Sequence, residues 1–109
     1  MAYVTICTEE EFPNDGRMKF AHEGLDIVLF KIDDKYYAID RQCSHSGGDL
    51  STGTLEKDII ICPVHEATFS VKTGKFVDIG YTSPALVRIM HDIMAYNVIV
   101  HEGKVMVEV

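Results

Sequence analysis

Two short stretches of this sequence each bring a cysteine and a histidine close together. RQCSHSGGDL, residues 41–50, contains Cys43 and His45, and CPVHEATF, which begins at residue 62, contains Cys62 and His65. The pattern is Cys-x-His, then sixteen residues, then Cys-x-x-His. A chain of 109 residues with 3 cysteines and 5 histidines rarely produces this spacing by chance. We therefore predict that Cys43, His45, Cys62 and His65 are metal ligands.

The four side chains offer two thiolates and two imidazoles, a set that suits either a tetrahedral zinc ion or a 2Fe–2S cluster. Zinc sites commonly use Cys–Cys and His–His pairs, whereas each pair here is mixed. Mixed pairs suit a binuclear cluster with the cysteines on one iron and the histidines on the other, because each loop must then reach both irons. Gly47 and Gly48 let the backbone approach a sulfide and offer it N–H groups. Zinc remains the alternative.

Most of the remaining sequence predicts short strands that would carry these two loops. Apolar or alternating segments predict strands over residues 3–6, 17–22, 26–32, 36–39, 59–62, 67–71 and 75–79, and a hairpin over 96–109. Turns are predicted at Glu23–Gly24, Asp33–Asp34, Thr73–Gly74 and Glu102–Gly103. Residues 84–96 have apolar side chains at helical spacing, which allows a short helix or turn there. The pattern predicts one mainly antiparallel β domain, a small barrel or sandwich.

CSHSGGDLSTG followed by CPVHEATFSVKTGKF resembles the signature of the Rieske proteins. The stretches VLFKIDDKYYAIDRQC before it and YNVIVHEGKVMVEV after it also resemble small Rieske-type ferredoxins, so that most of the chain is covered. The resemblance implies an all-β, single Rieske-like domain over 1–109, made of antiparallel strands with a small cluster-binding subdomain of two loops, about 41–53 and 61–70. It implies one [2Fe–2S] cluster, with Cys43 and Cys62 on one iron and His45 and His65 on the other.

Several residues depart from the respiratory branch of that family. Gly48 and Val64 stand where that branch has a disulfide across the cluster, and Ala67 and Phe69 stand where it has hydroxyl donors. Fewer donors stabilise the reduced cluster less, so we expect a potential in the lower half of the Rieske range of roughly −150 to +300 mV. Glu66, a carboxylate beside a ligand, is expected to raise the pKa of the imidazole and to oppose reduction.

One further segment and two single residues are expected to shield the cluster. Residues 80–85, GYTSPA, resemble the family's proline-containing third loop, and Leu50 and Pro63 are the other candidates. The remaining cysteine, Cys7, is interpreted as a small apolar residue at a strand end. The other histidines, His22, His91 and His101, lack partners at ligand spacing and are expected at the surface. Met90 and Met94 are expected to pack against the barrel, and Asp49 is expected to cap its loop.

The composition restricts the classes of partner. With 17 acidic and 10 basic residues the formal charge is −7, which argues against nucleic acid, since binding it needs a basic face. No apolar run approaches the roughly 20 residues of a membrane span, and the first residues do not resemble a signal peptide. Three widely spaced cysteines do not form a disulfide framework, so we expect a cytoplasmic protein.

The resemblance implies a soluble one-electron carrier that shuttles electrons from a reductase to a terminal oxidoreductase. No constellation of catalytic residues is apparent, and neither an enzyme activity nor a small-molecule substrate is expected. The more specific alternative is the ferredoxin component of an aromatic-ring dioxygenase system. An alternative of another class is a zinc-binding interaction module, and a Rieske-like subunit of a nitrite reductase is a further one.

Overall fold

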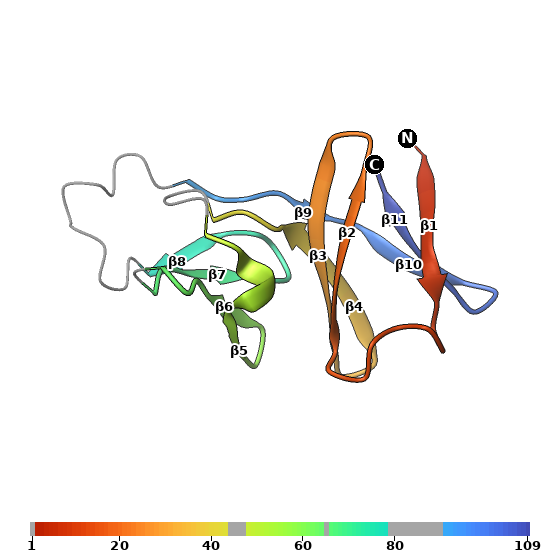
Figure 1. Ribbon diagram of the computed structural model, residues 1–109, viewed down its shortest axis with the longest axis horizontal. Helices are drawn as coiled ribbons and strands as arrows, with labels where there is room; N and C mark the ends of the chain where they lie inside the picture. The colour runs from red at the N-terminus through yellow and green to blue at the C-terminus, as the bar shows by residue number, and fades with distance from the viewer. Residues whose placement is uncertain (1, 44–47, 65, 79–90) are drawn as a thin grey trace.

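The computed structural model describes residues 2–43, 48–64, 66–78 and 91–109. Strands account for most of it (Figure 1). They are β1 (Tyr3–Thr8), β2 (Arg17–His22), β3 (Leu25–Ile32), β4 (Lys35–Asp40), β5 (Thr54–Glu56), β6 (Ile59–Ile61), β7 (Thr68–Ser70), β8 (Phe76–Asp78), β9 (Ala95–Tyr96), β10 (Val98–His101) and β11 (Lys104–Glu108), with a short 3-10 helix η1 (Leu50–Thr52) after β4. The predicted all-β class is confirmed.

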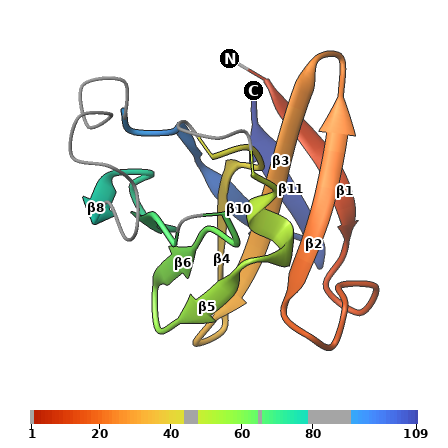
Figure 2. The same cartoon turned by 60° about the vertical axis from the view of Figure 1, so that its left-hand side comes forward.

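The strands form three antiparallel sheets, with the orders β1-β11-β10, β2-β3-β4-β9 and β5-β6-β7-β8. The sheet that contains β3 and β4 lies between the other two along the longest axis of the molecule (Figure 1). Turned by 60°, the same arrangement shows η1 beside β2, at the junction of the middle sheet and the β5–β8 sheet (Figure 2). The chain ends lie together, because the N–H of Val109 donates to the carbonyl of Ala2 at 2.8 Å.

Hairpin turns with two consecutive left-handed residues connect several of these strands. Glu23 and Gly24 have φ angles of 46° and 85°, Asp33 and Asp34 have 52° and 65°, and Glu102 and Gly103 have 51° and 75°. Such pairs match the twist of adjacent antiparallel strands, and Gly, Asn and Asp tolerate them best. All three turns were predicted from these dipeptides, and the strands beside them begin and end within a residue or two of the predicted bounds.

In the middle sheet, β3 lies between two buried clusters, and this explains its unbroken apolar run. Val28 and Phe30 belong to a buried cluster shared with β6 and β7, here called the loop-side core. Ile27 and Leu29, the alternate residues of the same strand, belong to a second cluster shared with β11. Successive side chains of a strand point to opposite faces, so a strand between two cores is apolar at every position.

The helix allowed over 84–96 is not found in the part of that segment that is described. Residues 79–90 lie outside the described residues, and 91–94 are irregular before β9. Ala95 and Tyr96 pair with Ile39 and Ala38 of β4 instead. Backbone pairing with β4 therefore overrides the helical spacing. The expectation that Met94 packs against the barrel is wrong, because its side chain is 61% exposed.

Two small strands were not predicted as such. β5 lies in the stretch expected to be loop, and β9 lies where a helix was allowed. Three residues and two residues give too little alternation for a sequence pattern to be recognised. Both strands depend on neighbours that are already ordered, β6 for one and β4 for the other.

Candidate metal centre

The first cysteine loop leaves β4 and returns to η1. Cys43 is only 3% exposed, and its N–H donates to the carbonyl of Gly48 at 2.9 Å. One residue further out, Gln42 and Asp49 form an isolated antiparallel bridge. The two ends of the loop are therefore fixed side by side, with His45 between them in sequence. Residues 44–47, and with them His45, lie outside the described part of the chain.

The second cysteine loop connects β6 to β7. Cys62 is fully buried, and its N–H donates to the carbonyl of Ala67 at 2.8 Å. The register of the two strands, with Ile60 opposite Phe69 and Ile61 opposite Thr68, brings these two residues together. Each cysteine N–H thus bonds the carbonyl five residues further on, and in each loop a predicted histidine ligand lies between. His65 itself is outside the described residues.

The two cysteines come together in one core. Neither Cys43 nor Cys62 forms a disulfide, and both belong to the loop-side core, together with Leu50, Ile60 and Phe69. Two buried thiols on separate loops are the soft ligands that iron–sulfur and zinc sites require. The described residues therefore fit half of the predicted ligand set. No group of three or more possible metal-binding side chains is found among them, which is consistent with both histidines lying in the undescribed stretches.

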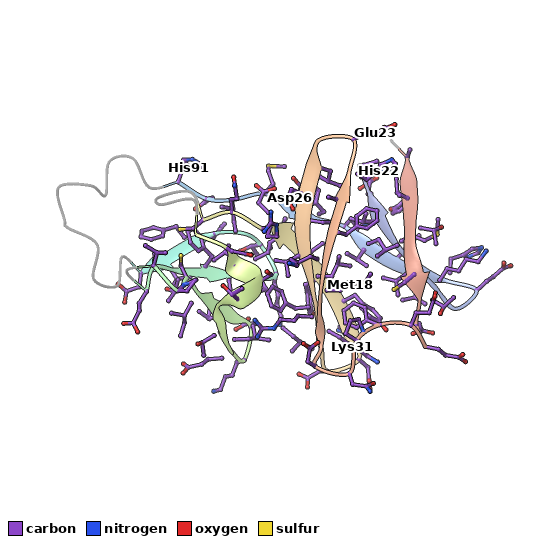
Figure 3. The ribbon with its side chains drawn as sticks, viewed as in Figure 1. Met18, His22, Glu23, Asp26, Lys31 and His91 are labelled. Atoms are coloured by element: carbon purple, nitrogen blue, oxygen red, sulfur yellow. The ribbon has the colours of Figure 1, made fainter. Side chains whose placement is uncertain are left out.

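The third cysteine belongs to a different environment. Cys7 lies on β1, half-buried against the second core, on the far side of the middle sheet from the two loops. Burial, and then the nearby carboxylate of Glu11, raise the pKa of its thiol above the usual value. Its interpretation as a small apolar strand residue is confirmed. Of the other histidines, His22 and His101 lie at exposed strand ends and His91 is exposed beside the loop region (Figure 3).

The residues predicted to surround the metal divide into buried and exposed groups. Leu50, Ala67 and Phe69 are fully buried in the loop-side core, so Leu50 is placed to shield the site and the other two offer no hydroxyl there. Pro63, in contrast, is exposed and does not pack into the core. The predicted third loop, residues 80–85, lies outside the described residues.

Glu66, next to the second histidine, has a backbone conformation unusual for its type. Its side chain is exposed, and its φ angle is 58°, in the left-handed region. A residue with a Cβ pays a steric cost there that glycine does not. The tight closure between Cys62 and Ala67 imposes this conformation, since Glu66 lies in the turn that it closes.

A side-chain network beside the first loop was not predicted from the sequence, apart from the capping role of Asp49. Arg41 donates two hydrogen bonds to the carboxylate of Asp26, each 2.7 Å, and a third to Asp49 at 3.0 Å. Asp49 caps η1 by accepting from the N–H and hydroxyl of Ser51, at 2.9 and 2.6 Å. Asp26, labelled in Figure 3, comes from β3. The available signal was an arginine two residues before a predicted ligand, followed by an aspartate at the end of the loop.

The hydrogen bonds of this network lower the pKa of both carboxyl groups. For Asp26 the bonds from Arg41 are the main cause, and they outweigh the opposing effect of burial. For Asp49 burial would raise the pKa, but the hydrogen bonds from Ser51 and the charge of Arg41 together lower it. The pKa of the Arg41 guanidinium is raised, chiefly by its bonds to Asp26. All three groups are therefore charged at neutral pH.

A second set of contacts holds the segment that returns towards β9. The carboxylate of Asp40 accepts from the Tyr96 hydroxyl at 2.7 Å and from the N–H of Met94 at 3.0 Å. Burial and the Asp40 carboxylate raise the pKa of Tyr96. On the other side, the N–H of Ile93 donates to the carbonyl of Gly74 at 2.9 Å, and a Cβ at Gly74 would overlap the carbonyl of Ile93. Residues 93–96 thus connect the middle sheet with the β7–β8 turn.

Comparison with known proteins gives a consistent result. Residues 2–99 match the family model described as the Rieske [2Fe-2S] domain. The 3-phenylpropionate/cinnamic acid dioxygenase ferredoxin subunit of Photorhabdus laumondii subsp. laumondii is 34% identical over 110 residues, covering 100% of this chain and 96% of that protein. Among the described residues, no helix is long and apolar enough to cross a membrane.

Solved structures show the same architecture. The ferredoxin of carbazole 1,9a-dioxygenase from Nocardioides aromaticivorans IC177 superposes with a TM-score of 0.81 at 25% identity, covering 98% of this chain and 97% of that one. A chain from a complex of reduced oxygenase and oxidized ferredoxin in carbazole 1,9a-dioxygenase gives a TM-score of 0.79 at 27% identity, covering 96% of this chain and all of the other. The fold and the length of this chain are thus those of small ferredoxins.

Proposed function

This chain belongs to the Rieske [2Fe-2S] domain family, and we propose that it is the ferredoxin of an aromatic-ring dioxygenase system. As a ferredoxin of that family it is a one-electron carrier with one Rieske [2Fe–2S] cluster and is not itself an enzyme. The observation that carries the cluster assignment is the pair of buried cysteines in one core, each closing a loop that contains a histidine in sequence.

We assign the ligands as Cys43, His45, Cys62 and His65. The cluster, when bound, accepts and releases a single electron. Cys43 and Cys62 would hold it from the buried side, because both thiols lie within the loop-side core. Leu50 and Phe69 are fully buried, and they exclude water from that side of the site. The single domain is proposed to span residues 1–109, with cluster-binding loops at about 41–53 and 61–70.

The proposed partners are a reductase that supplies the electron and a terminal oxygenase that receives it. The relative from Photorhabdus is a subunit of a dioxygenase, and one similar solved chain comes from a complex of an oxygenase with a ferredoxin. Both support a carrier between two proteins. We also propose a cytoplasmic location, since none of the three cysteines, all of them described, forms a disulfide, as a reducing compartment favours.

The cluster and its ligands are tested together on the purified protein. Iron and sulfide are assayed, and low-temperature EPR is recorded after reduction with dithionite. We expect two iron and two sulfide per chain and the rhombic signal of a cluster with histidine ligands on one iron. Zinc in place of iron, with no EPR signal, would overturn the electron-carrier proposal and leave the zinc-binding module.

Matched variants separate ligands from bystanders. Cys43→Ser, Cys62→Ser, His45→Ala and His65→Ala are each expected to lose the cluster or its rhombic signal. The controls are Cys7→Ser and His101→Ala, which replace the same residue types on the opposite side of the middle sheet and should keep both. Retention of the rhombic signal in either histidine variant would contradict that ligand assignment.

The partner assignment is tested by electron transfer. The reduced protein is mixed in a stopped-flow instrument with the oxidised terminal oxygenase of a 3-phenylpropionate dioxygenase system, and bleaching or recovery of its visible absorbance is followed. We expect reoxidation within the turnover time of the oxygenase. If the protein carries the cluster but is not reoxidised faster than in buffer, it is an electron carrier for a different oxidoreductase.

A further inference from the structure

We propose that Arg41 is a positioning residue for cluster binding, which fixes both ends of the first cysteine loop from a single guanidinium group. This inference rests on the proposed function, because it takes Cys43 as a cluster ligand. Asp26 and Asp49 are its two anchors. The role depends on the forked geometry of the arginine and not on its charge alone.

Arg41 contacts residues at both ends of the first loop, through its side chain and through its backbone. Its side chain makes the bidentate pair with Asp26 and the third bond with Asp49. Its main-chain N–H donates to the carbonyl of Asp26 at 3.1 Å, and its carbonyl accepts from the N–H of Leu50 at 2.7 Å. Both backbone groups and all three guanidinium nitrogens are therefore engaged by residues that flank the loop or by β3.

The two anchors are themselves fixed. Asp26 lies on β3, where it pairs with Ala21 of β2 in the middle sheet. Asp49 caps η1, and its carbonyl also accepts from the Thr52 hydroxyl at 2.8 Å. Two guanidinium nitrogens of Arg41 are thus bonded to Asp26 of the middle sheet, and the third is bonded to Asp49. Cys43 is two residues from Arg41 in sequence, and its N–H donates to the carbonyl of Gly48, the residue before Asp49. The backbone on both sides of this contact is therefore attached to the network.

The network differs from an ordinary surface ion pair. Its side chains are 27% (Arg41), 39% (Asp26) and 33% (Asp49) exposed, and the bonds are 2.7 to 3.0 Å long. Lys72 and Asp58, in comparison, are 50% and 40% exposed and 3.8 Å apart. Planar arginine can bind one carboxylate with two parallel bonds and a second with the remaining nitrogen, whereas lysine offers a single point charge. A lysine at position 41 would keep the charge and lose the fixed geometry.

Four variants test the role, with a matched control. Arg41→Lys keeps the charge, Arg41→Gln removes it, and Asp26→Asn and Asp49→Asn remove one anchor each. Lys72→Gln is the control, because it breaks the ordinary ion pair between Lys72 of the β7–β8 turn and Asp58 of the β5–β6 turn. The rate of iron release from the oxidised holoprotein to a ferrous chelator with ascorbate is measured, together with the EPR linewidth after reduction. Far-UV circular dichroism checks the fold of each variant.

We expect Arg41→Lys and Arg41→Gln to release iron at similar rates, each about tenfold or more faster than wild type, as outer partners of metal ligands typically do. Asp26→Asn should have a larger effect than Asp49→Asn, since Asp26 accepts two of the three side-chain bonds. The EPR signal of these variants should broaden because the first loop samples more than one geometry. Lys72→Gln should match wild type in both measurements.

The outcomes separate this role from the proposed function. If wild type contains no iron–sulfur cluster, the proposed function is wrong and this inference falls with it. If wild type contains the cluster and Arg41→Lys retains iron and linewidth as wild type does, only the positioning role is overturned. Wild-type behaviour in Arg41→Lys with rapid loss in Arg41→Gln would show that charge suffices. If Arg41→Gln does not fold, Arg41→Lys and Asp26→Asn decide the question by the same two measurements.

Discussion

The two cysteine loops share one backbone closure but are held in place by different forces. In both, the cysteine N–H bonds the carbonyl five residues further on, Gly48 for Cys43 and Ala67 for Cys62. The first loop is flanked by a charged network on β3, η1 and Arg41. The second loop is the end of a hairpin whose inner side chains are apolar and fully buried. Two loops with the same cysteine closure can therefore be built with polar or with apolar support.

The difference predicts distinct sensitivities. Charged networks at partly exposed positions respond to pH and salt. Buried apolar hairpins respond to volume, because tightly packed interiors tolerate neither cavities nor added atoms. The first loop should therefore weaken with acid and the second with small changes of side-chain size. Variants that affect one loop and spare the other test this comparison.

The largest effect is expected from Gly53→Ala, at the end of the first loop, where Gly53 lies against the base of the second loop. A Cβ at Gly53 would overlap the carbonyl oxygen of Ile61, the residue before Cys62, and contact the Ile60 side chain at 3.3 Å. The obstacle is backbone in a β-sheet, which cannot rotate away, so we expect a loss of about 3 kcal/mol or more in the free energy of unfolding. Urea denaturation followed by circular dichroism measures it.

The control for that variant is Gly24→Ala. Gly24 has a φ angle of 85° and no atom within 4 Å of the added Cβ, so the variant lowers the free energy of unfolding through backbone strain alone. That cost is about 1–2 kcal/mol. If both alanine variants lost the same stability, close packing at Ile61 would not be what distinguishes the base of the second loop.

The next largest effect is the pH dependence of the stability that Asp26 contributes beside the first loop. The pKa of Asp26 is lowered from its usual 3.8 by Arg41, so on acidification the unfolded chain takes up a proton first. The stabilisation by this carboxylate is therefore present above about pH 4 and is lost as the pH falls through the lower folded-state pKa. The difference in unfolding free energy between wild type and Asp26→Asn should narrow below pH 4, measured by urea denaturation at each pH.

The second loop supplies the matched comparison for the pH series. Phe69→Leu removes buried apolar volume from the loop-side core and no charge. It should lose stability by a similar amount at every pH at which the protein folds, about 1 kcal/mol or more. A difference that narrowed in acid for Phe69→Leu as well would mean that the whole core, and not the first loop alone, responds to protonation.

How much of this could be predicted from the sequence differs between the elements and the contacts. The four proposed ligands, the three left-handed turns and most strands follow from local patterns, because ligand spacing, turn dipeptides and alternation are all local signals. β9 could not be predicted, since its two residues are ordered by pairing with β4, more than fifty positions away in sequence. Over residues 91–96, the described part of the segment with helical spacing, no helix forms.

The site shows the same division between local and distant signals. Asp49 as a loop cap was predictable, because its partner Ser51 is two residues away. The bond between Arg41 and Asp26 was not, because it joins residues fifteen positions apart, and nothing in the sequence fixes which acid an arginine meets. The close approach of Gly53 to Ile61 was hidden for a similar reason, since glycine in a loop predicts a turn and not a packing contact.

A smaller effect concerns the reduction potential. Ala67→Ser and Phe69→Tyr place hydroxyl groups at fully buried positions in the loop-side core, which also contains the cysteine of the second loop. A hydrogen bond to a charged acceptor is worth about 1.5 kcal/mol, which for one electron corresponds to about 60 mV. We expect the midpoint potential to rise by up to about that amount for each variant, from a wild-type value in the lower half of the Rieske range.

Redox titration followed by visible absorbance measures that shift. Val105→Thr adds a hydroxyl to the second core, on the far side of the middle sheet, and should leave the potential unchanged. A wild-type potential near the top of the Rieske range would contradict the expectation that Ala67 and Phe69 lower it. An unchanged or lower potential in both hydroxyl variants would show that these positions do not donate to the cluster.

The smallest effects are expected at Glu66, where backbone and charge can be separated. Glu66 has a φ angle of 58° and an exposed side chain. Glu66→Gly should raise the free energy of unfolding by up to about 1 kcal/mol, because relief of the left-handed strain exceeds the added entropy of the unfolded chain. Glu66→Gln keeps the strain and removes the charge, so it should leave stability unchanged and raise the potential by less than the hydroxyl variants do. Thermal denaturation and redox titration over a pH series measure the two effects. If Glu66→Gln stabilised the protein as much as Glu66→Gly, the carboxylate and not the backbone would be the unfavourable element, and the second loop would then share the electrostatic sensitivity of the first.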